Sequence, residues 1–272
     1  MRENVEQRIG REQDLDDLNR WLRDYVHAFG APVVGAMHIT CADESEFECG
    51  ESFQRHVVNH LLPRLKFGCR AAFRLANLGG RYEPGALAVA EHHFATPETR
   101  DAFKVLLIKI NAHVAVDGHG ESATFGRMQR YDTESTACGA LHALLAGAEL
   151  PAVAELRSLF ERDDVDRVGQ LLDPQQVPPE QRSLFVALAN ARLQARRVED
   201  DIQTHGAHSP TVYVVAAAVT FNRPGRDTEL LCGLTTVDQR QQPPTTSYVG
   251  LGDLPARYRL GEVYGRVQIT ET

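Results

Sequence analysis

The sequence has few features of a secreted, membrane-spanning or nucleic-acid-binding protein. Its longest nearly continuous apolar run, Val212 to Phe221, is about half of the ~20 residues that a membrane helix needs. Lys and Arg total 29 against 37 Asp and Glu, and a net charge of −8 gives no concentrated basic surface for phosphates. The cysteines are too few and too scattered for a small disulfide framework, at positions 41, 49, 69, 138 and 232. We therefore expect no membrane partner and no nucleic-acid partner.

The opening segment also points away from secretion. Met1 to Gln7 is charged and polar, unlike the apolar core of a signal peptide. Together with the scattered cysteines, this predicts a protein of the reducing cytoplasm. At 272 residues, of which 43% are hydrophobic, the chain can bury a large core.

The hydrophobic pattern alternates between helices and buried strands. Leu15, Leu18, Leu22 and Val26 keep helical spacing, which predicts an amphipathic helix ending at Gly30. Its apolar stripe is suited to cover either the chain's own sheet or a partner subunit. Further strands and helices follow in turn, so we expect an α/β fold with a mostly parallel β-sheet flanked by helices.

Cys41 and His113 stand beside two of the predicted strands. Cys41 follows a strand over 31–40, at the carboxyl edge where open α/β sheets place their sites. His113 interrupts the apolar run from Val105 to Val116. Each has a structural alternative, because a strand cysteine is often a small buried hydrophobe and a lone histidine is often a hydrogen-bonded core residue.

Cys138 lies where a third element is predicted to begin. Ser135 and Thr136 are suited to cap a helix that continues through Leu141, and a thiol in the first turn has its thiolate stabilised by the helix dipole. The alternative is that Cys138 is only a small residue for close packing beside Gly139.

Together these side chains match the needs of a catalytic zinc ion. Such zinc is held by three ligands drawn from Cys, His and carboxylate, with the fourth position left to water. Zinc lowers the pKa of that water to about 7 in the best-known case. Asp43, two residues after Cys41, is placed to accept the hydrogen bond of the water and later a proton. The sequence therefore predicts a Zn²⁺ cofactor on Cys41, His113 and Cys138.

The order of these motifs resembles the limiting-CO2-inducible LCIB/LCIC family, whose members are similar to β-carbonic anhydrases and include theta-class enzymes. The matching features run from about residue 30 to 235. They are Cys-x-Asp at 41–43, a small-residue segment ending in tandem histidines at 75–93, Ala-His-Val-Ala-Val at 112–116, Glu-Ser-x-x-Cys-Gly-Ala-Leu at 134–141, and a helix and strand over 183–219.

The resemblance implies a β-carbonic anhydrase-like zinc enzyme that hydrates CO2 reversibly to bicarbonate, acting as a homodimer. It implies Cys41, His113 and Cys138 as zinc ligands and Asp43 as the aspartate that gates the metal-bound water. His92 and His93, at the end of a predicted helix, are candidates to pass the proton to solvent.

One position departs from the broader β-type pattern, Cys-x-Asp-x-Arg. The arginine that pairs with the aspartate is replaced by Ser45. The candidates to stand in for it are Arg55, Arg74 and Arg81, among which the sequence does not choose.

The resemblance also suggests how the chain is divided. We expect an N-terminal helix over 1–30, the zinc domain over 31–235, and an extension over 236–272. The extension holds a polar loop at 239–246 and an alternating segment at 258–269 that predicts an edge strand.

Three alternatives to carbonic anhydrase activity remain. The chain is a silent zinc-binding structural or regulatory protein of the same fold, a hydrolase of a CO2-like molecule or small ester, or a cysteine hydrolase using Cys138 with His113.

Overall fold

A computed structural model describes residues 5–61, 72–93, 102–118, 123–130, 133–149, 154, 181–205, 210–241 and 243–250. Its strands are β1 (Glu12–Asp14), β2 (Val33–Cys41), β3 (Phe73–Asn77), β4 (Lys104–Asp117), β5 (Thr124–Phe125), β6 (Arg127–Arg130), β7 (Thr133–Thr136), β8 (Thr211–Asn222), β9 (Thr228–Asp238) and β10 (Thr245–Gly250). Its helices are α2 (Leu15–His27), α3 (Phe47–Phe53), α4 (Asn59–Leu61), α5 (Ala86–His93), α6 (Gly139–Leu145) and α9 (Arg182–His205), with short 3₁₀ turns η1 (Glu44–Glu46) and η5 (Leu78–Gly80) and a π-helical turn η2 (Gln54–Val58).

The main sheet is mixed, with a parallel centre. Its strand order is β1-β9-β8-β4-β2-β3, and β8, β4, β2 and β3 run parallel to one another. Antiparallel pairs add β9 beside β8, and β1 and β10 beside β9. The predicted α/β fold, with a mostly parallel sheet flanked by helices, is confirmed.

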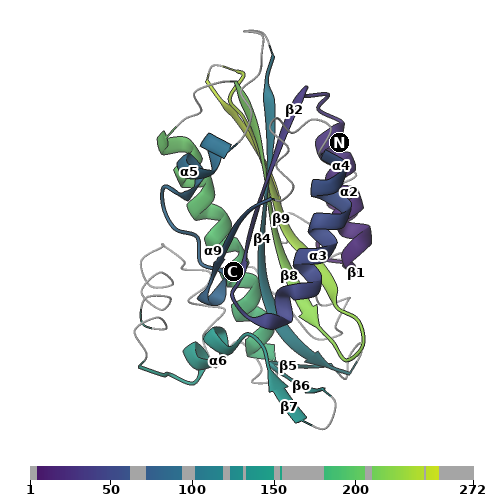
Figure 1. Ribbon diagram of the computed structural model, residues 1–272. Helices are drawn as coiled ribbons and strands as arrows, with labels where there is room; N and C mark the ends of the chain where they lie inside the picture. Colours follow the sequence, from purple (N-terminus) through teal and green to yellow (C-terminus); the bar gives the residue numbers. More distant parts are fainter. Residues whose placement is uncertain are drawn as a thin grey trace.

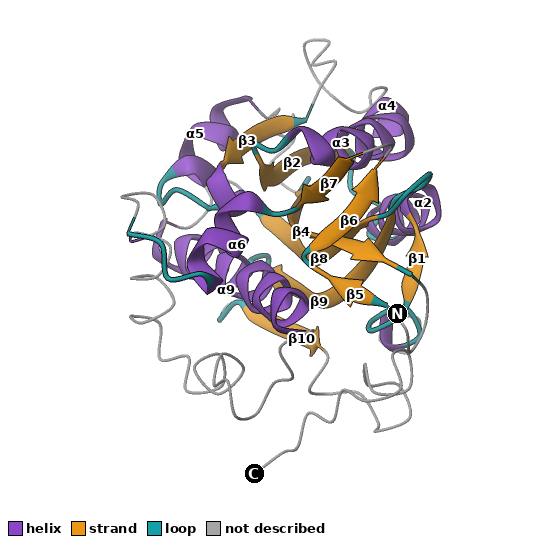
Figure 2. Cartoon of the chain, turned by 90° about the horizontal axis from the view of Figure 1, so that it is seen from below, coloured by secondary structure: helices purple, strands orange, loops and turns teal. Residues whose placement is uncertain are grey.

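Helices cover both faces of this sheet (Figure 1; Figure 2 shows the same layers from below). The helices α2, α3 and α4 lie on one face, and α5, α6 and α9 lie on the other. Because both faces are covered, the central strand β4 is buried along its whole length except at Asp117. This burial explains why its sequence is a nearly continuous apolar run rather than an alternating one.

The N-terminal helix packs on the chain's own sheet. Leu18, Leu22 and Val26 of α2 share a buried cluster with Val105 and Val212. Asp14 caps the helix by accepting a hydrogen bond from the backbone N–H of Asp16 at 2.9 Å. The apolar stripe is therefore used within this chain, which leaves it no part in covering a partner subunit.

The chain's last described strand belongs to the main sheet. The strand β9 continues to Asp238, past the predicted domain boundary at 235, and β10 pairs with β9 from Thr245. The predicted polar loop at 239–246 thus ends in the first two residues of β10. The edge strand expected at 258–269 lies outside the described residues, and the division into three segments stays a prediction.

None of the helices that the structure describes combines the length and the apolarity needed to cross a lipid bilayer.

Candidate metal centre

Three side chains from distant parts of the sequence meet at one end of the sheet. Cys41 is the last residue of β2, His113 lies near the end of β4, and Cys138 immediately precedes α6. All three are almost fully buried, and their ligand atoms lie within 4.8 Å of one another. The two sulfur atoms are 3.6 Å apart. The structure thus brings together the three residues that the sequence singled out.

The spacing of the sulfur atoms fits a tetrahedral zinc ion. Two thiolates at a Zn–S distance of about 2.3 Å and a tetrahedral angle would place their sulfurs roughly 3.8 Å apart, close to the separation of Cys41 and Cys138. The donor set of two sulfurs and one imidazole nitrogen is also one that catalytic zinc uses. These three residues therefore fit the metal.

The hydrogen bonds around His113 fix which nitrogen faces the cluster. Its Nδ1 lies 2.9 Å from Oδ1 of Asn222. The Asn222 amide is oriented because its Nδ2 donates to the Ser45 carbonyl at 2.9 Å and to Asp227 at 3.0 Å. Nδ1 must therefore carry the proton and donate it to Oδ1, since that oxygen only accepts. The opposite nitrogen, Nε2, faces the cluster and carries a lone pair when His113 is neutral, as a metal-ligating histidine must be.

That nitrogen is buried without a hydrogen-bond partner among the described residues. Buried polar atoms are nearly always hydrogen-bonded, so an exception calls for an explanation. An imidazole held through its Nδ1–H with a bare Nε2 is the usual arrangement of a metal-ligating histidine. The orphaned Nε2 of His113 thus fits a metal ion between it and the two sulfurs.

Asp43 is held beside the cluster by Ser45. Its Oδ1 accepts hydrogen bonds from the Ser45 backbone N–H at 3.0 Å and from the Ser45 hydroxyl at 2.9 Å. The same hydroxyl lies 3.0 Å from His113 Nδ1, and Asp43 Oδ2 lies 3.9 Å from His113 Nε2. The residue at the β-type arginine position thus contacts the aspartate itself.

The candidate arginines have other neighbours in the structure. Arg55 lies 3.6 Å from Asp16, and Arg81 pairs with Glu83 at 2.5 Å. The Arg74 guanidinium would lie 3.0 Å from a Cβ added at Gly50. No contact that the structure records for the described residues joins any of these arginines to Asp43.

In the metal-free cluster, each of the three ligand residues shifts the pKa of at least one of the others. Hydrogen bonding from Cys138, followed by contacts with His113, lowers the pKa of Cys41 despite its burial. The same hydrogen bond to Cys41, together with burial, raises the pKa of Cys138. Burial opposes the charged form of His113, but Cys41 and Glu46 outweigh it and raise the pKa of His113 to about 9.

A further carboxyl group lies behind His113. Glu46 is 2% exposed, neither of its oxygens has a hydrogen-bond partner among the described residues, and Oε1 is 3.9 Å from His113 Nδ1. Burial raises the pKa of Glu46 to about 8. Nothing in the sequence distinguished this residue, because an acidic residue in a polar stretch after a strand is common.

A glycine turn closes over Cys41 from the other side. The backbone N–H of Gly79 donates to Cys41 Sγ at 3.2 Å. Gly80 has φ +67°, and a Cβ there would lie 2.7 Å from the carbonyl oxygen of Asn111. Only glycine fits this close approach. The turn formers at 79–85 thus form a loop beside the cluster.

The predicted cap of the helix that follows Cys138 is wrong. Ser135 and Thr136 lie in β7, which pairs with β6 as a hairpin, and α6 begins only at Gly139. Cys138 itself is the N-cap residue, and its side chain makes no capping hydrogen bond. The pairing of β7 with β6 outweighed the local propensity of Ser135 and Thr136 to cap a helix.

His92 and His93 are the last two residues of α5, where the sequence placed them. Their proposed part in proton transfer stays a prediction.

Asn222 and Asp227 are the functional neighbours that the sequence analysis missed. A signal was present, because Asn222 ends the apolar strand β8 just as Cys41 ends β2. Polar residues at the carboxyl ends of parallel strands gather at one edge of a sheet. The same reasoning that selected Cys41 would have selected Asn222.

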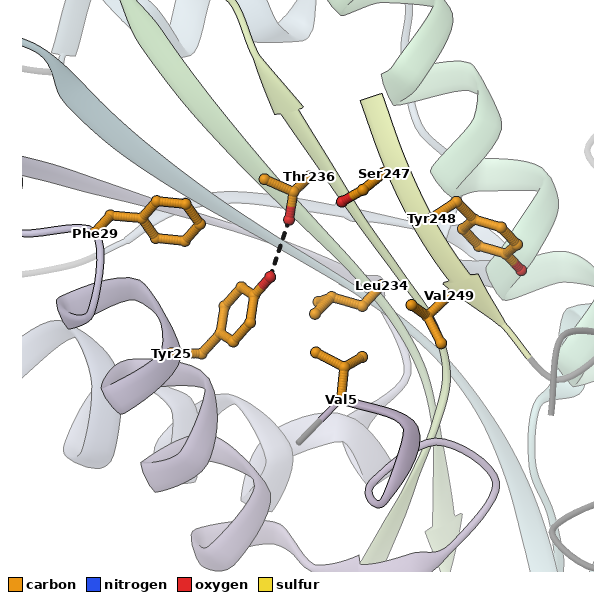
Figure 3. Close-up of a pocket in the computed structure, with 8 residues that line it drawn as sticks. All are labelled: Val5, Tyr25, Phe29, Leu234, Thr236, Ser247, Tyr248 and Val249. Carbon is orange, nitrogen blue, oxygen red and sulfur yellow. Dashed lines mark hydrogen bonds between the residues drawn. The ribbon is translucent and has the colours of Figure 1, made fainter. Parts of the chain in front are cut away.

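A pocket elsewhere shares no residue with this centre. It measures about 270 Å³ and lies between α2 and the strands β9 and β10 (Figure 3). Its walls are mostly apolar, with one hydrogen bond at 3.2 Å between the Tyr25 hydroxyl and Thr236 Oγ1. Its lining residues are Val5, Tyr25, Phe29, Leu234, Thr236, Ser247, Tyr248 and Val249.

The fold is shared with solved structures of limiting-CO2-inducible proteins. The chain is similar to PtLCIB4, a homolog of the limiting CO2-inducible protein LCIB, with a TM-score of 0.60 and 14% identity over 92% of this chain and 99% of that one. It is similar to LCIB itself with a TM-score of 0.54 and 17% identity, over 90% of this chain and 98% of that one. No protein-family model and no curated protein sequence matches the chain. The resemblance to the LCIB/LCIC family is thus confirmed at the level of the fold.

Proposed function

We propose that the chain is a zinc-dependent, carbonic anhydrase-like protein that hydrates CO2 reversibly to bicarbonate. The observation that carries the proposal is the bare Nε2 of His113, which lies within 4.8 Å of two cysteine sulfurs and is oriented by Asn222. When bound, zinc lowers the pKa of water to about 7 and so supplies the nucleophile for CO2. The fold shared with LCIB supports the same reading.

The residues around the metal would bind it, exclude water and transfer protons. Cys41, His113 and Cys138 hold the metal, and the apolar cluster that includes Cys41 and Cys138 excludes bulk water from that side. Asp43, oriented by Ser45, accepts a proton near His113 Nε2 and releases it to solvent, to which its side chain is 25% exposed. His92 or His93 would carry protons away from the site.

The test measures CO2 hydration, followed by isotope exchange with water, on protein with zinc confirmed near one per chain. We expect activity that a chelator abolishes, and Cys138→Ser to lose both zinc and activity. Cys232→Ser is the matched control, because this buried cysteine on β9 donates to the Ala217 carbonyl, away from the cluster. A metal-replete, active Cys138→Ser protein would contradict the assignment.

The presence of Ser45 supports a second candidate function. The chain would then be a catalytically silent zinc protein with a structural or regulatory role. The serine binds Asp43 without the positive charge that an arginine would supply there. If zinc-replete wild type lacks activity and Ser45→Arg gains it, the silent protein is the correct assignment. Robust wild-type activity would exclude it.

We propose that the protein is a homodimer of the cytoplasm, with CO2 or bicarbonate as its small-molecule partner. Two large apolar side chains support self-association near the centre, since Phe47 and Leu78 are 65% and 58% exposed. Phe47 begins α3, and Leu78 precedes the Gly79 that contacts Cys41. Sedimentation of wild type and a Phe47→Ser/Leu78→Ser variant tests this, and a monomeric wild type would contradict it.

A further inference from the structure

The glycine turn over Cys41 is fastened from its far side by two buried amides of α9. Asn190 Nδ2 donates to the Gly79 carbonyl at 2.5 Å. Gln194 Oε1 accepts from the Tyr82 backbone N–H at 2.8 Å. Gln194 Nε2 also donates to Asn190 Oδ1 at 3.0 Å, so the two amides form one continuous brace, one helical turn apart.

Both residues of this brace are buried in the protein interior. Asn190 is 1% exposed and Gln194 is 0% exposed. Buried amides among the apolar residues of a helix are costly unless their hydrogen bonds are made. Two of the three bonds named above end on one short turn, Gly79 to Tyr82, and the third joins the two amides to each other. The two polar residues thus serve the turn rather than the general packing of α9.

The braced turn ends at the metal centre. Asn190 holds the carbonyl of Gly79, the residue whose N–H donates to Cys41 Sγ. The turn has no room to shift toward the sheet, because Gly80 already lies against the Asn111 carbonyl and the Cys41 backbone. Asn190 and Gln194 hold the same turn from α9, through the Gly79 carbonyl and the Tyr82 backbone N–H.

We propose that Asn190 and Gln194 are positioning residues that aim the Gly79 N–H at Cys41 Sγ and thereby tune the metal. The inference rests on the proposed zinc site. A hydrogen bond to a thiolate draws electron density from the sulfur, so the sulfur donates less to the metal. With two thiolates already neutralising the dication, this withdrawal keeps the zinc electrophilic enough to acidify water.

The test replaces zinc by Co²⁺ and compares wild type with Asn190→Leu and Gln194→Met. Partners that orient ligands commonly change metal affinity by about 10- to 100-fold when removed. We expect a change of that order in the cobalt affinity of Asn190→Leu, measured by chelator competition, and a smaller change for Gln194→Met. We also expect the thiolate-to-cobalt charge-transfer band to move to longer wavelength, because an unbonded thiolate is easier to oxidise.

Leu193→Ala is the matched control. It lies between the two amides on α9, is 2% exposed in the apolar cluster, and should lower stability through a cavity while leaving the cobalt spectrum unchanged. The proposal is overturned if the charge-transfer band moves as far in Leu193→Ala as in the amide variants. It is also overturned if the band moves in none of the variants that fold. If Asn190→Leu does not fold, Gln194→Met decides.

Amide hydrogen exchange in metal-free protein separates this proposal from the proposed function. The amides of residues 79–82 should exchange faster in Asn190→Leu than in Leu193→Ala. If the wild-type protein binds neither cobalt nor zinc, the proposed zinc function is wrong, whatever the hydrogen exchange of residues 79–82 shows. Bound metal with unchanged exchange and spectrum overturns the brace alone.

Discussion

Two buried polar clusters lie along the same strand, and they differ in whether their hydrogen bonds are complete. The metal cluster, Cys41, His113 and Cys138, leaves His113 Nε2 without a partner. The second cluster centres on Lys109, four residues earlier on β4, and includes Glu229, Asn19, Asn111 and His38; we call it the Lys109 cluster.

The Lys109 cluster is closed. Lys109 Nζ donates to Glu229 at 2.8 Å and to Asn19 at 2.9 Å, and Lys109 and Glu229 are both 0% exposed. Asn111 Nδ2 donates to Glu229 and to Thr220, and Asn111 Oδ1 lies 3.0 Å from His38 Nε2. Since the Asn111 amide is oriented by its two acceptors, His38 Nε2 carries a proton and donates it.

The difference separates polar groups that hold the fold from polar groups that await a ligand. Both clusters are equally buried and both contain a histidine, so burial alone does not mark a functional site. A buried cluster with every donor and acceptor matched needs nothing further. A bare nitrogen beside two sulfurs lacks one component, and its geometry fits a metal ion.

The largest effect should come from opening the Lys109 cluster. Lys109→Met leaves the Glu229 carboxylate buried without its cation, so we expect a loss of about 3–5 kcal/mol in the free energy of unfolding. Urea denaturation of metal-free protein measures it. Lys109→Met/Glu229→Leu should recover part of the loss because neither charge remains, and a single variant as stable as wild type would contradict the closed-network account.

A smaller effect is expected from the support of the metal cluster. Asn222→Leu removes the acceptor for His113 Nδ1–H, and we expect zinc affinity to fall by about 10- to 100-fold. Thr220→Val is the matched control on the same strand. The Thr220 hydroxyl accepts from Asn111 of the Lys109 cluster, and valine keeps the backbone pairing of residue 220 with His113, so the variant should cost about 1 kcal/mol of stability and leave zinc affinity unchanged. Zinc competition assays should therefore separate the two, and equal affinities would count against the assigned tautomer of His113.

The effect that is smallest at neutral pH comes from His38, because it develops only in acid. Burial, followed by the Lys109 charge, lowers the pKa of His38 to about 3, so the folded protein keeps it neutral. The unfolded chain takes up a proton below pH ~6.5, and stability is therefore lost as the pH falls from about 6.5 towards 3.

His38→Gln removes this proton while keeping a donor for Asn111. The variant should lose stability less steeply in that window, by up to about 1.4 kcal/mol per pH unit. Parallel urea titrations of the two proteins give the difference, and superimposable slopes would show that His38 does not stay neutral in the fold.

Much of the fold could be predicted from the sequence because burial on both faces leaves long apolar runs. The strands around His113 and Val212 are of this kind, whereas the helix ending before Gly30 could be predicted from the helical spacing of its apolar residues. Ser135 and Thr136 were misassigned because their strand pairing with β6 is tertiary, whereas their capping propensity is local. The ligand residues carried a sequence signal through their motifs. Glu46, Asn190 and Gln194 carried none, since their roles follow from contacts with residues distant in the chain.

X-ray absorption at the zinc edge of the purified protein tests the central claim most directly. The account predicts about one zinc per chain, with two sulfur neighbours at about 2.3 Å and nitrogen or oxygen neighbours at about 2.0–2.1 Å. Cys138→Ser should lose that zinc, and Cys232→Ser should keep it. Protein that excludes zinc when it is supplied, or that binds zinc without sulfur neighbours, would contradict the assignment of Cys41, His113 and Cys138 as the metal centre.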